Sequence, residues 1–237
     1  MKSGVVRPRV YGAIEAGGTK FICAIADADR HMLAHHRVAT TTPAATLGEV
    51  IAWFNERVRE QGPLAALGIA SFGPLGLEPG SPTYGKVLPT PKPGWSGADL
   101  VGPLQTALDC PVGLDTDVNA AALAEARFGA GRDAVSVAYV TVGTGIGAGL
   151  VLGGVPVHGR LHPEVGHISL RRDPRDADFA GCCPFHGDCL EGLASGPAIM
   201  ARWGRPLDQL DADHPGTRII GGYLGQLAAN LALTCSV

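Results

Sequence analysis

The sequence predicts an α/β protein of two lobes, and three observations lead to that prediction. Two glycine-rich turns, at residues 12–20 and 141–149, are built alike, because each follows an apolar strand-like run and leads into another. Strand-like and helix-like segments alternate between the two turns. The 237 residues are enough for one large domain or two modest ones. We therefore expect an N-terminal lobe over residues 1–130 and a C-terminal lobe over residues 131–237, with a cleft between them.

The first lobe is predicted to contain three strands, a helix, a strand, a helix and a strand. The predicted strands span residues 10–14, 21–26, 31–39, 66–72 and 111–114. Leu47, Val50 and Phe54 fall at helical spacing, and a second helix is expected over residues 97–108. Residues 73–97 are rich in Gly, Pro, Ser and Thr and are predicted to form a long loop, which in a compact domain is usually functional. This order of elements is typical of one half of an actin-like, ribonuclease-H-like fold.

An alanine-rich helix ends the first lobe, and the second half begins near Ala134 with a strong strand. The predicted elements are a helix over residues 117–128, strands over 134–142 and 151–157, and helices over 194–203 and 218–233. Between the strands and the last helices, residues 162–192 are polar and contain Pro, Cys and His. Such a stretch cannot hold its shape by core packing alone, so it needs another source of stability.

Each glycine turn offers backbone N–H groups that no side chain obstructs, which is typical of a phosphate site. The candidate phosphate-binding residues are Gly17, Gly18, Thr19, Lys20, Thr141, Gly143, Thr144 and Gly145. Neither turn is closed by the Gly-Lys-Ser/Thr of a Walker motif, and the second leads into a strand where a dinucleotide motif needs a helix. A plain hairpin turn is the alternative for either one. Two such turns in one chain favour a pair of loops that hold a polyphosphate.

A carboxylate lies between the two turns, at the start of a predicted helix. Asp117 follows a short strand, and helix capping is its alternative role. A base at this place can take the proton from a sugar hydroxyl that attacks a phosphoryl group. Asp115 is the rival base.

Cysteines and histidines cluster in the polar stretch of the second half. Cys183, His186 and Cys189 are separated by two-residue gaps, and His167 precedes them. Together they form a Cys₂His₂ set suited to tetrahedral, structural Zn²⁺. Cys182 can replace Cys183 as a ligand, and the alternative to a zinc site is a set of free thiols beside a surface histidine.

Composition excludes some classes of partner and predicts a compartment. The formal charge of −3 argues against a nucleic-acid partner bound through a broad basic surface. No run of about 18 apolar residues is present, so no membrane span is expected. The first eight residues lack the apolar stretch of a secretory signal, and the cytoplasm is the expected compartment.

The chain resembles the ROK family of sugar kinases, and its fructokinase branch in particular. The matching motifs are the Gly-x-Ile-Glu-Ala-Gly-Gly-Thr-Lys start at Gly12, Thr116–Asn119, Thr141–Gly149, His162–His167 and Cys183–Gly192. The resemblance implies phosphorylation of a hexose at its 6-hydroxyl by ATP with Mg²⁺, in a homodimer. It implies that Asp117 is the catalytic base and that His167, Cys183, His186 and Cys189 hold zinc. The sugar-binding positions that it implies are Asn119, Glu164, His167 and Glu191.

Features of the branch favour fructose over glucose or mannose. They are Glu15, the loop Ser81–Gly85, the run Thr90–Trp95 and the Cys-Pro-Phe-His form of the zinc site. Trp95 and Tyr84 can stack on a sugar face, and packing in the core or loop is an equal interpretation.

Other readings of the resemblance remain open at this stage. A sugar-sensing regulator of the same fold carries a DNA-binding segment before the kinase-like part, and only about nine residues precede the first strand. Family members usually continue for dozens of residues beyond this chain's last residue, Val237, through a segment that holds adenosine and a terminal helix. We therefore also expect either a fragment or a truncated, catalytically impaired sugar-binding remnant, with poor stability or tight self-association.

Overall fold

The structure is a computed structural model that describes residues 9–211 and 213–237. The chain forms two compact units that divide between Asp117 and Val118. This division comes earlier than the lobe boundary expected after residue 130. The reason lies in the second unit, where a Cβ placed on Gly149 would lie 1.9 Å from the carbonyl oxygen of Val118. The first turn of the helix that follows Val118 therefore packs tightly against a strand of the second unit.

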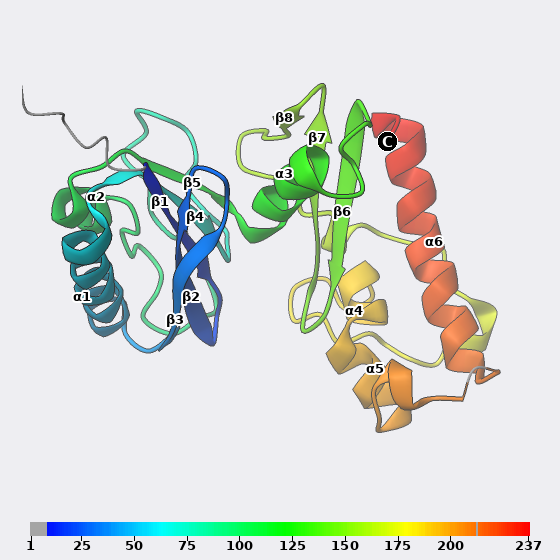
Figure 1. Cartoon of the computed structure of the whole chain (residues 1–237). Coiled ribbons are helices and arrows are strands. Elements are labelled where there is room, and N and C mark those ends of the chain that lie inside the picture. Colours follow the sequence, from blue (N-terminus) through cyan, green and yellow to red (C-terminus); the bar gives the residue numbers. More distant parts are fainter. Residues whose placement is uncertain (1–8, 212) are drawn as a thin grey trace, which may run out of the picture. The chain divides into compact units, whose positions relative to one another are not determined.

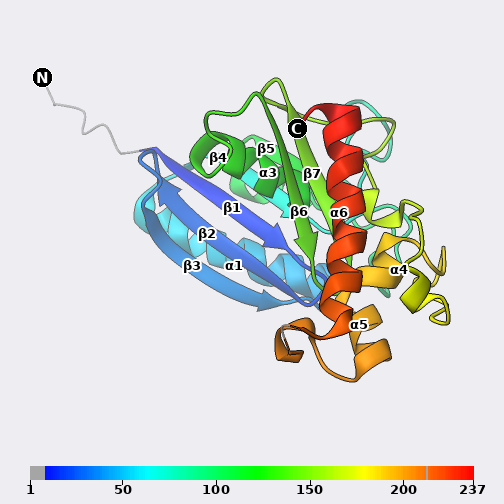
Figure 2. The ribbon, with the colours of Figure 1, turned by 90° about the vertical axis from the view of Figure 1, so that its right-hand side faces the viewer.

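The first unit is built on a five-stranded sheet in the order β3-β2-β1-β4-β5. The strands are β1 (Val10–Ala16), β2 (Lys20–Asp27), β3 (Met32–Ala39), β4 (Leu64–Ser71) and β5 (Val112–Thr116). Strands β1, β2 and β3 are antiparallel neighbours, side by side in Figure 2, while β4 runs parallel to β1 and β5 parallel to β4. The predicted fold class is confirmed, and the predicted strands are all present with small shifts at their ends.

Helices α1 (Pro43–Gln61) and α2 (Gly102–Leu108) cover one face of this sheet (Figure 1). Helix α1 begins because the side chain of Thr42 accepts a hydrogen bond from the backbone N–H of Ala45 at 3.3 Å. Its apolar side packs on alternate sheet residues, and Phe54 and Leu67 are at most 1% exposed. The helix predicted from residue 97 begins instead at Gly102, because the Asp99 carboxylate accepts from the N–H groups of Val101 and Gly102.

The second unit holds a three-stranded antiparallel sheet with helices on both faces. Its elements are α3 (Asp117–Phe128, whose first residue closes the first unit), β6 (Ser136–Val142), β7 (Ile146–Leu152), β8 (Val155–Pro156), α4 (Leu190–Ala194), α5 (Gly196–Trp203) and α6 (Pro215–Cys235). Ile146 and Leu150 of β7 are buried in one apolar cluster with residues of α4, α5 and α6. Gly147 and Gly149 face the other way, toward Val118 of α3. Figure 1 shows α3 and α6 on opposite sides of these strands.

Two predicted elements of the second unit are wrong in detail. The strand predicted over residues 151–157 is a β7–β8 hairpin, because Gly153 and Gly154 turn the chain with φ of 58° and 81°. The helix predicted over residues 194–203 begins instead at Gly196 as α5, since Ser195 ends the separate helix α4 and its side chain caps α5. Within the described part of the chain, no helix is long and apolar enough to cross a membrane.

The segment between β8 and α4 has little regular structure. It contains two 3₁₀ turns, Val165–His167 and Pro174–Asp176. This agrees with the expectation that the polar residues 162–192 lack a core of their own.

Candidate active site and metal centre

The first glycine turn joins β1 to β2 and is open to solvent. The N–H of Gly17 donates to the carbonyl of Lys20 at 2.9 Å, and the hydroxyl of Thr40 donates to the carbonyl of Gly17 at 2.7 Å. Gly18 and Thr19 are exposed, and a Cβ placed on Gly18 would meet nothing within 4 Å. The turn is thus a hairpin whose shape is fixed and whose backbone a ligand can approach.

The second glycine turn joins β6 to β7 and is held from α4. The N–H of Gly143 donates to the carbonyl of Gly145 at 2.9 Å, which closes the turn. One carboxylate oxygen of Glu191 accepts from the N–H of Ile146 at 2.9 Å and would lie 2.7 Å from a Cβ on Gly145. Thr144 is exposed at the tip. Glu191, a predicted sugar-binding residue, therefore also fixes the base of this turn.

The glycines of the second motif serve two different purposes. Gly143 has open space around its Cβ position, as a phosphate-binding turn needs. Gly149 instead admits the backbone of α3, and a Cβ placed on Gly147 would lie 3.3 Å from a methyl group of Val118. A pattern that looks like one phosphate motif is therefore partly a packing motif.

The two candidate bases lie in different elements. Asp115 is inside β5, and its carboxylate accepts from the N–H of Thr116 at 2.7 Å. Asp117 is exposed and is the first residue of α3, where a helix N-terminus favours a negative charge. Two residues further along α3, Asn119 is 1% exposed and its Nδ2 lies 3.3 Å from His158 Nε2.

The four predicted metal ligands come together in the second unit. Ligand atoms of His167, Cys183, His186 and Cys189 all lie within 4.8 Å of one another. The His167 Nδ1 atom is 3.5 Å from Cys189 Sγ and 3.8 Å from Cys183 Sγ. In a tetrahedral Zn²⁺ site, ligand atoms are separated by about 3.3–3.8 Å, so this donor set fits the ion. Cys182 is exposed and is not part of the group.

The metal-ligand cluster is connected to the second glycine turn through a short helix. Cys189 precedes α4, and its Sγ accepts from the N–H of Gly192 at 3.5 Å. Glu191, in the first turn of the same helix, reaches the N–H of Ile146. The metal-ligand candidate Cys189 is therefore only two residues from Glu191, whose carboxylate fixes the base of the second glycine turn.

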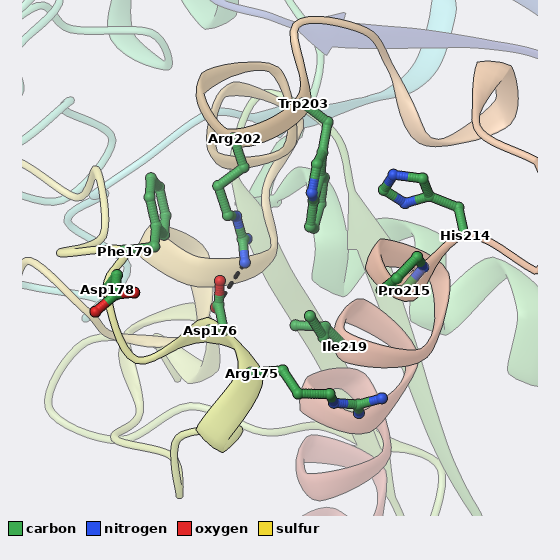
Figure 3. Close-up of a pocket in the computed structure, with 9 residues that line it drawn as sticks. All are labelled: Arg175, Asp176, Asp178, Phe179, Arg202, Trp203, His214, Pro215 and Ile219. Atoms are coloured by element: carbon green, nitrogen blue, oxygen red, sulfur yellow. Dashed lines mark hydrogen bonds and ion pairs between the residues drawn. The ribbon is translucent and has the colours of Figure 1, made fainter.

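A second polar cluster surrounds the pocket drawn in Figure 3. The pocket has a volume of about 330 Å³. Its lining residues are Arg175, Asp176, Asp178, Phe179, Arg202, Trp203, His214, Pro215 and Ile219. The Arg202 guanidinium lies between the rings of Phe179 and Trp203, with its carbon 4.4 and 4.5 Å from their centroids. None of these side chains is a predicted site residue.

The side chains of this cluster are already paired with protein groups. Asp176, 4% exposed at its side chain, accepts from Arg202 at 2.6 Å and from the Tyr223 hydroxyl at 2.9 Å. Arg202 also donates to the carbonyls of Leu193 and Ala198. Burial, and then the neighbouring Asp176 carboxylate, raise the pKa of Tyr223. The cluster therefore supports the polar segment by joining it to α5 and α6.

The sequence matches the ROK family over residues 11–231, and the chain belongs to this family. It is 50% identical to a fructokinase of Zymomonas mobilis over 94% of this chain and 75% of that protein. A fructokinase of Lactococcus lactis is 43% identical over 94% of this chain and 74% of its own length. The chain thus spans about three quarters of these relatives. Among solved structures, a ROK hexokinase from Thermus thermophilus is 29% identical with a TM-score of 0.73, covering 94% of this chain and 77% of its own.

The structure corrects the interpretation of Trp95 and adds Lys92 to the residues that contact the first glycine turn. Trp95 is 0% exposed and packs between Phe21 and Phe72, so its suggested stacking on a sugar is wrong and core packing is right. Lys92, in the same run, reaches the first glycine turn by donating to the carbonyl of Gly18. No motif of the sequence assigns a role to Lys92, and its only signal is a charge between two prolines just before a tryptophan.

Proposed function

We propose that the chain transfers the γ-phosphoryl group of ATP to the 6-hydroxyl of D-fructose, which gives D-fructose 6-phosphate and ADP. The observation that carries this proposal is the 50% identity to a fructokinase over 94% of the chain. The two accessible glycine turns and the acidic start of α3 are the features that such a reaction uses.

In this proposal Asp117 is the general base. Its carboxylate accepts the proton of the sugar 6-hydroxyl as that oxygen attacks the phosphoryl group. The turn residues Gly17–Lys20 and Thr141–Gly145 hold the phosphates through backbone N–H groups and hydroxyls. Mg²⁺ bound with ATP neutralises the charge on the phosphates.

The sugar is proposed to be held by Asn119, Glu164, His167 and Glu191. Carboxylates and amides suit this task because they fix the directions of several hydroxyl groups at once. Glu164 is oriented by a neighbour, since its Oε1 lies 3.5 Å from Nδ1 of His162, whose side chain is 7% exposed.

Zn²⁺ is proposed to bind His167, Cys183, His186 and Cys189. Four protein ligands leave no open position, so the ion stabilises the segment and takes no part in the transfer. With Nδ1 of His167 on the metal side, its Nε2–H remains as a donor for a sugar hydroxyl. Removing zinc should therefore weaken sugar binding as well as stability, and unchanged sugar binding by a folded, metal-free sample would contradict this coupling.

A matched pair of cysteine variants tests the ligand set. Cys183→Ser should abolish stoichiometric zinc, measured by inductively coupled plasma mass spectrometry, whereas Cys182→Ser should retain it because Cys182 is exposed and outside the group. The reverse result would assign the site to Cys182.

The reaction is tested by following ADP release with a panel of hexoses. Turnover should be highest with fructose and should fall about 10²–10⁴-fold in Asp117→Asn, which keeps the size of the side chain and removes the base. Asp115→Asn is the matched control, and a larger loss there would make Asp115 the base. No turnover with any hexose by the parent chain would favour an impaired sugar-binding remnant.

Another hexose is the second candidate for the substrate. Glucokinases of Streptomyces coelicolor and Streptomyces lividans are each 29% identical to this chain over 189 residues. Higher kcat/KM for glucose or mannose than for fructose in the same panel would select this alternative.

We also propose that the chain forms a homodimer in the cytoplasm. The support for the dimer is the family resemblance, and light scattering coupled to size-exclusion chromatography measures it directly. A monomeric mass at micromolar concentration would refute it.

A further inference from the structure

The run Thr90–Trp95 is fixed to the core of the first unit at its far end. Trp95 is 0% exposed, and its ring lies 5.5 Å from that of Phe21 and 5.6 Å from that of Phe72. Its indole Nε1–H donates to the carbonyl of Thr41 at 2.9 Å. A large, fully buried ring with its polar atom satisfied cannot change place without disrupting that core.

Short hydrogen-bonded turns hold the rest of the run in shape. The N–H of Trp95 donates to the carbonyl of Lys92 at 3.2 Å, and the N–H of Lys92 lies 3.4 Å from the hydroxyl of Thr90. Ser96 closes the loop, because its hydroxyl accepts from the N–H of Thr90 at 3.1 Å. Lys92 therefore projects from a backbone that is held on both sides.

The ammonium group of Lys92 lies against the first glycine turn. Its Nζ donates to the carbonyl of Gly18, across 74 residues of sequence. This uses one of the three N–H donors of an ammonium group. In residues 9–211 and 213–237, no carboxylate forms an ion pair with Lys92 within 4.0 Å. The positively charged ammonium group of Lys92, with two further N–H donors, therefore lies beside the exposed backbone of the first glycine turn.

We propose that Lys92 binds the oxygens of a phosphoryl group at this turn. The proposal rests on the proposed kinase function and adds a residue to its phosphate site. Backbone N–H groups alone supply partial charges, whereas a phosphoryl group in transfer carries several negative charges, and a lysine ammonium is a compact full charge that neutralises them. A hydrogen bond to an exposed carbonyl contributes little to folding, so holding the turn is a weak reason for placing a charge there.

Lys92→Met tests the proposal, because methionine keeps most of the length of the side chain and removes the charge. The matched control is Lys86→Met in the same loop, whose ammonium donates to the carbonyl of Pro82 at 3.0 Å and does not reach the glycine turn. Two phosphate sources are measured separately: KM for ATP, and the inhibition constant of fructose 6-phosphate as product. Lys92→Met should raise one or both about 10–100-fold, with KM for fructose changed less than about twofold, and Lys86→Met should change none of them. Lys92→Arg should recover part of the loss.

Each result has a defined meaning. A rise for ATP alone assigns the ammonium to the nucleotide phosphates, and a rise for fructose 6-phosphate alone assigns it to the transferred group. A lowered melting temperature with both constants unchanged would overturn the proposal, because it would make Lys92 a structural tie. If the parent chain has no turnover with any hexose, the proposed kinase function is contradicted, and the role of Lys92 needs a separate test. Calorimetric binding of Mg-ATP without sugar then decides the role of Lys92, and equal affinity of Lys92→Met and the parent chain would overturn it.

Discussion

The sheet of the first unit and the segment before α4 in the second unit are stabilised by different forces. The sheet packs under α1 and α2 through a continuous apolar cluster that includes Phe54, Leu67 and Trp95, each at most 1% exposed. Residues 157–189 bury few large apolar groups, and their polar side chains gather in the Cys/His cluster and around Asp176. Apolar contacts are numerous and individually weak, whereas each polar contact of the segment has few substitutes.

This difference predicts different responses to damage. Losing one apolar side chain leaves a cavity and the remaining contacts of the cluster. Losing one member of a buried polar network leaves its partner desolvated and unpaired. The candidate sugar residues Glu164 and His167 lie in the segment that depends on such networks.

Metal removal is expected to have the largest effect, and only on the second unit. Saturating zinc at about 1,000 times its dissociation constant stabilises the folded form by about 4 kcal/mol, and chelation removes this. Hydrogen exchange measured by mass spectrometry should then show deprotection of residues 158–194 and unchanged protection of β1 to β5. Equal deprotection of both units would contradict a metal effect that is confined to the second unit.

Asp176→Ala is expected to destabilise the second unit by about 3–5 kcal/mol. It leaves the guanidinium of Arg202, 6% exposed, without its carboxylate, and the Tyr223 hydroxyl without its acceptor. Asp178→Ala is the matched control because Asp178 is exposed, and it should cost less than about 0.5 kcal/mol. Hydrogen exchange in α5 and α6, followed by mass spectrometry over a series of urea concentrations, gives the unfolding midpoint of each variant. Equal midpoints for the two variants would contradict the role of this network.

Leu67→Ala gives the corresponding test in the first unit. Leu67 is 1% exposed, so the cavity should cost about 2–5 kcal/mol. The same substitution at Leu33, which is 42% exposed on β3, should cost well under about 1 kcal/mol. Thermal denaturation of both variants provides the comparison. Similar melting temperatures would mean that the apolar cluster does not control the stability of this unit.

The sequence predicted the first unit better than the second for the same physical reason. Hydrophobic periodicity reports burial against a sheet or helix, so the five strands and α1 were identified with small errors at their ends. The β7–β8 turn at Gly153 and Gly154 was missed because apolar residues on both sides of it look like one continuous strand. No periodicity describes residues 157–189, and there the spacing of Cys183, His186 and Cys189 was the useful signal.

The roles of single polar residues were predicted least well. Gly149 belongs to a phosphate-like motif, yet it faces the backbone of α3, which only tertiary packing reveals. Asp176 lies in a stretch rich in acidic and basic residues, yet its carboxylate is 4% exposed and bound to Arg202, 26 residues away. Lys92 contacts the first glycine turn only because the fold of the long loop brings its ammonium group to Gly18. Contacts between residues distant in sequence carry no local pattern.

The smallest predicted effect concerns alkaline pH and a buried thiol of the first unit. Burial, and then the charge of Glu49, raise the pKa of the Cys23 thiol in the first unit to about 12. The folded state therefore keeps a proton that the unfolded state releases above about pH 8.5, so stability is complete below that pH and is lost as the pH rises toward 12. At pH 10 the loss is about 1–2 kcal/mol, and Cys23→Ala should flatten the alkaline limb of a plot of unfolding free energy against pH. Part of the slope should remain, because burial also raises the pKa of Cys110 in this unit. A slope identical to that of the parent would mean that the thiolate of Cys23 is accommodated in the fold.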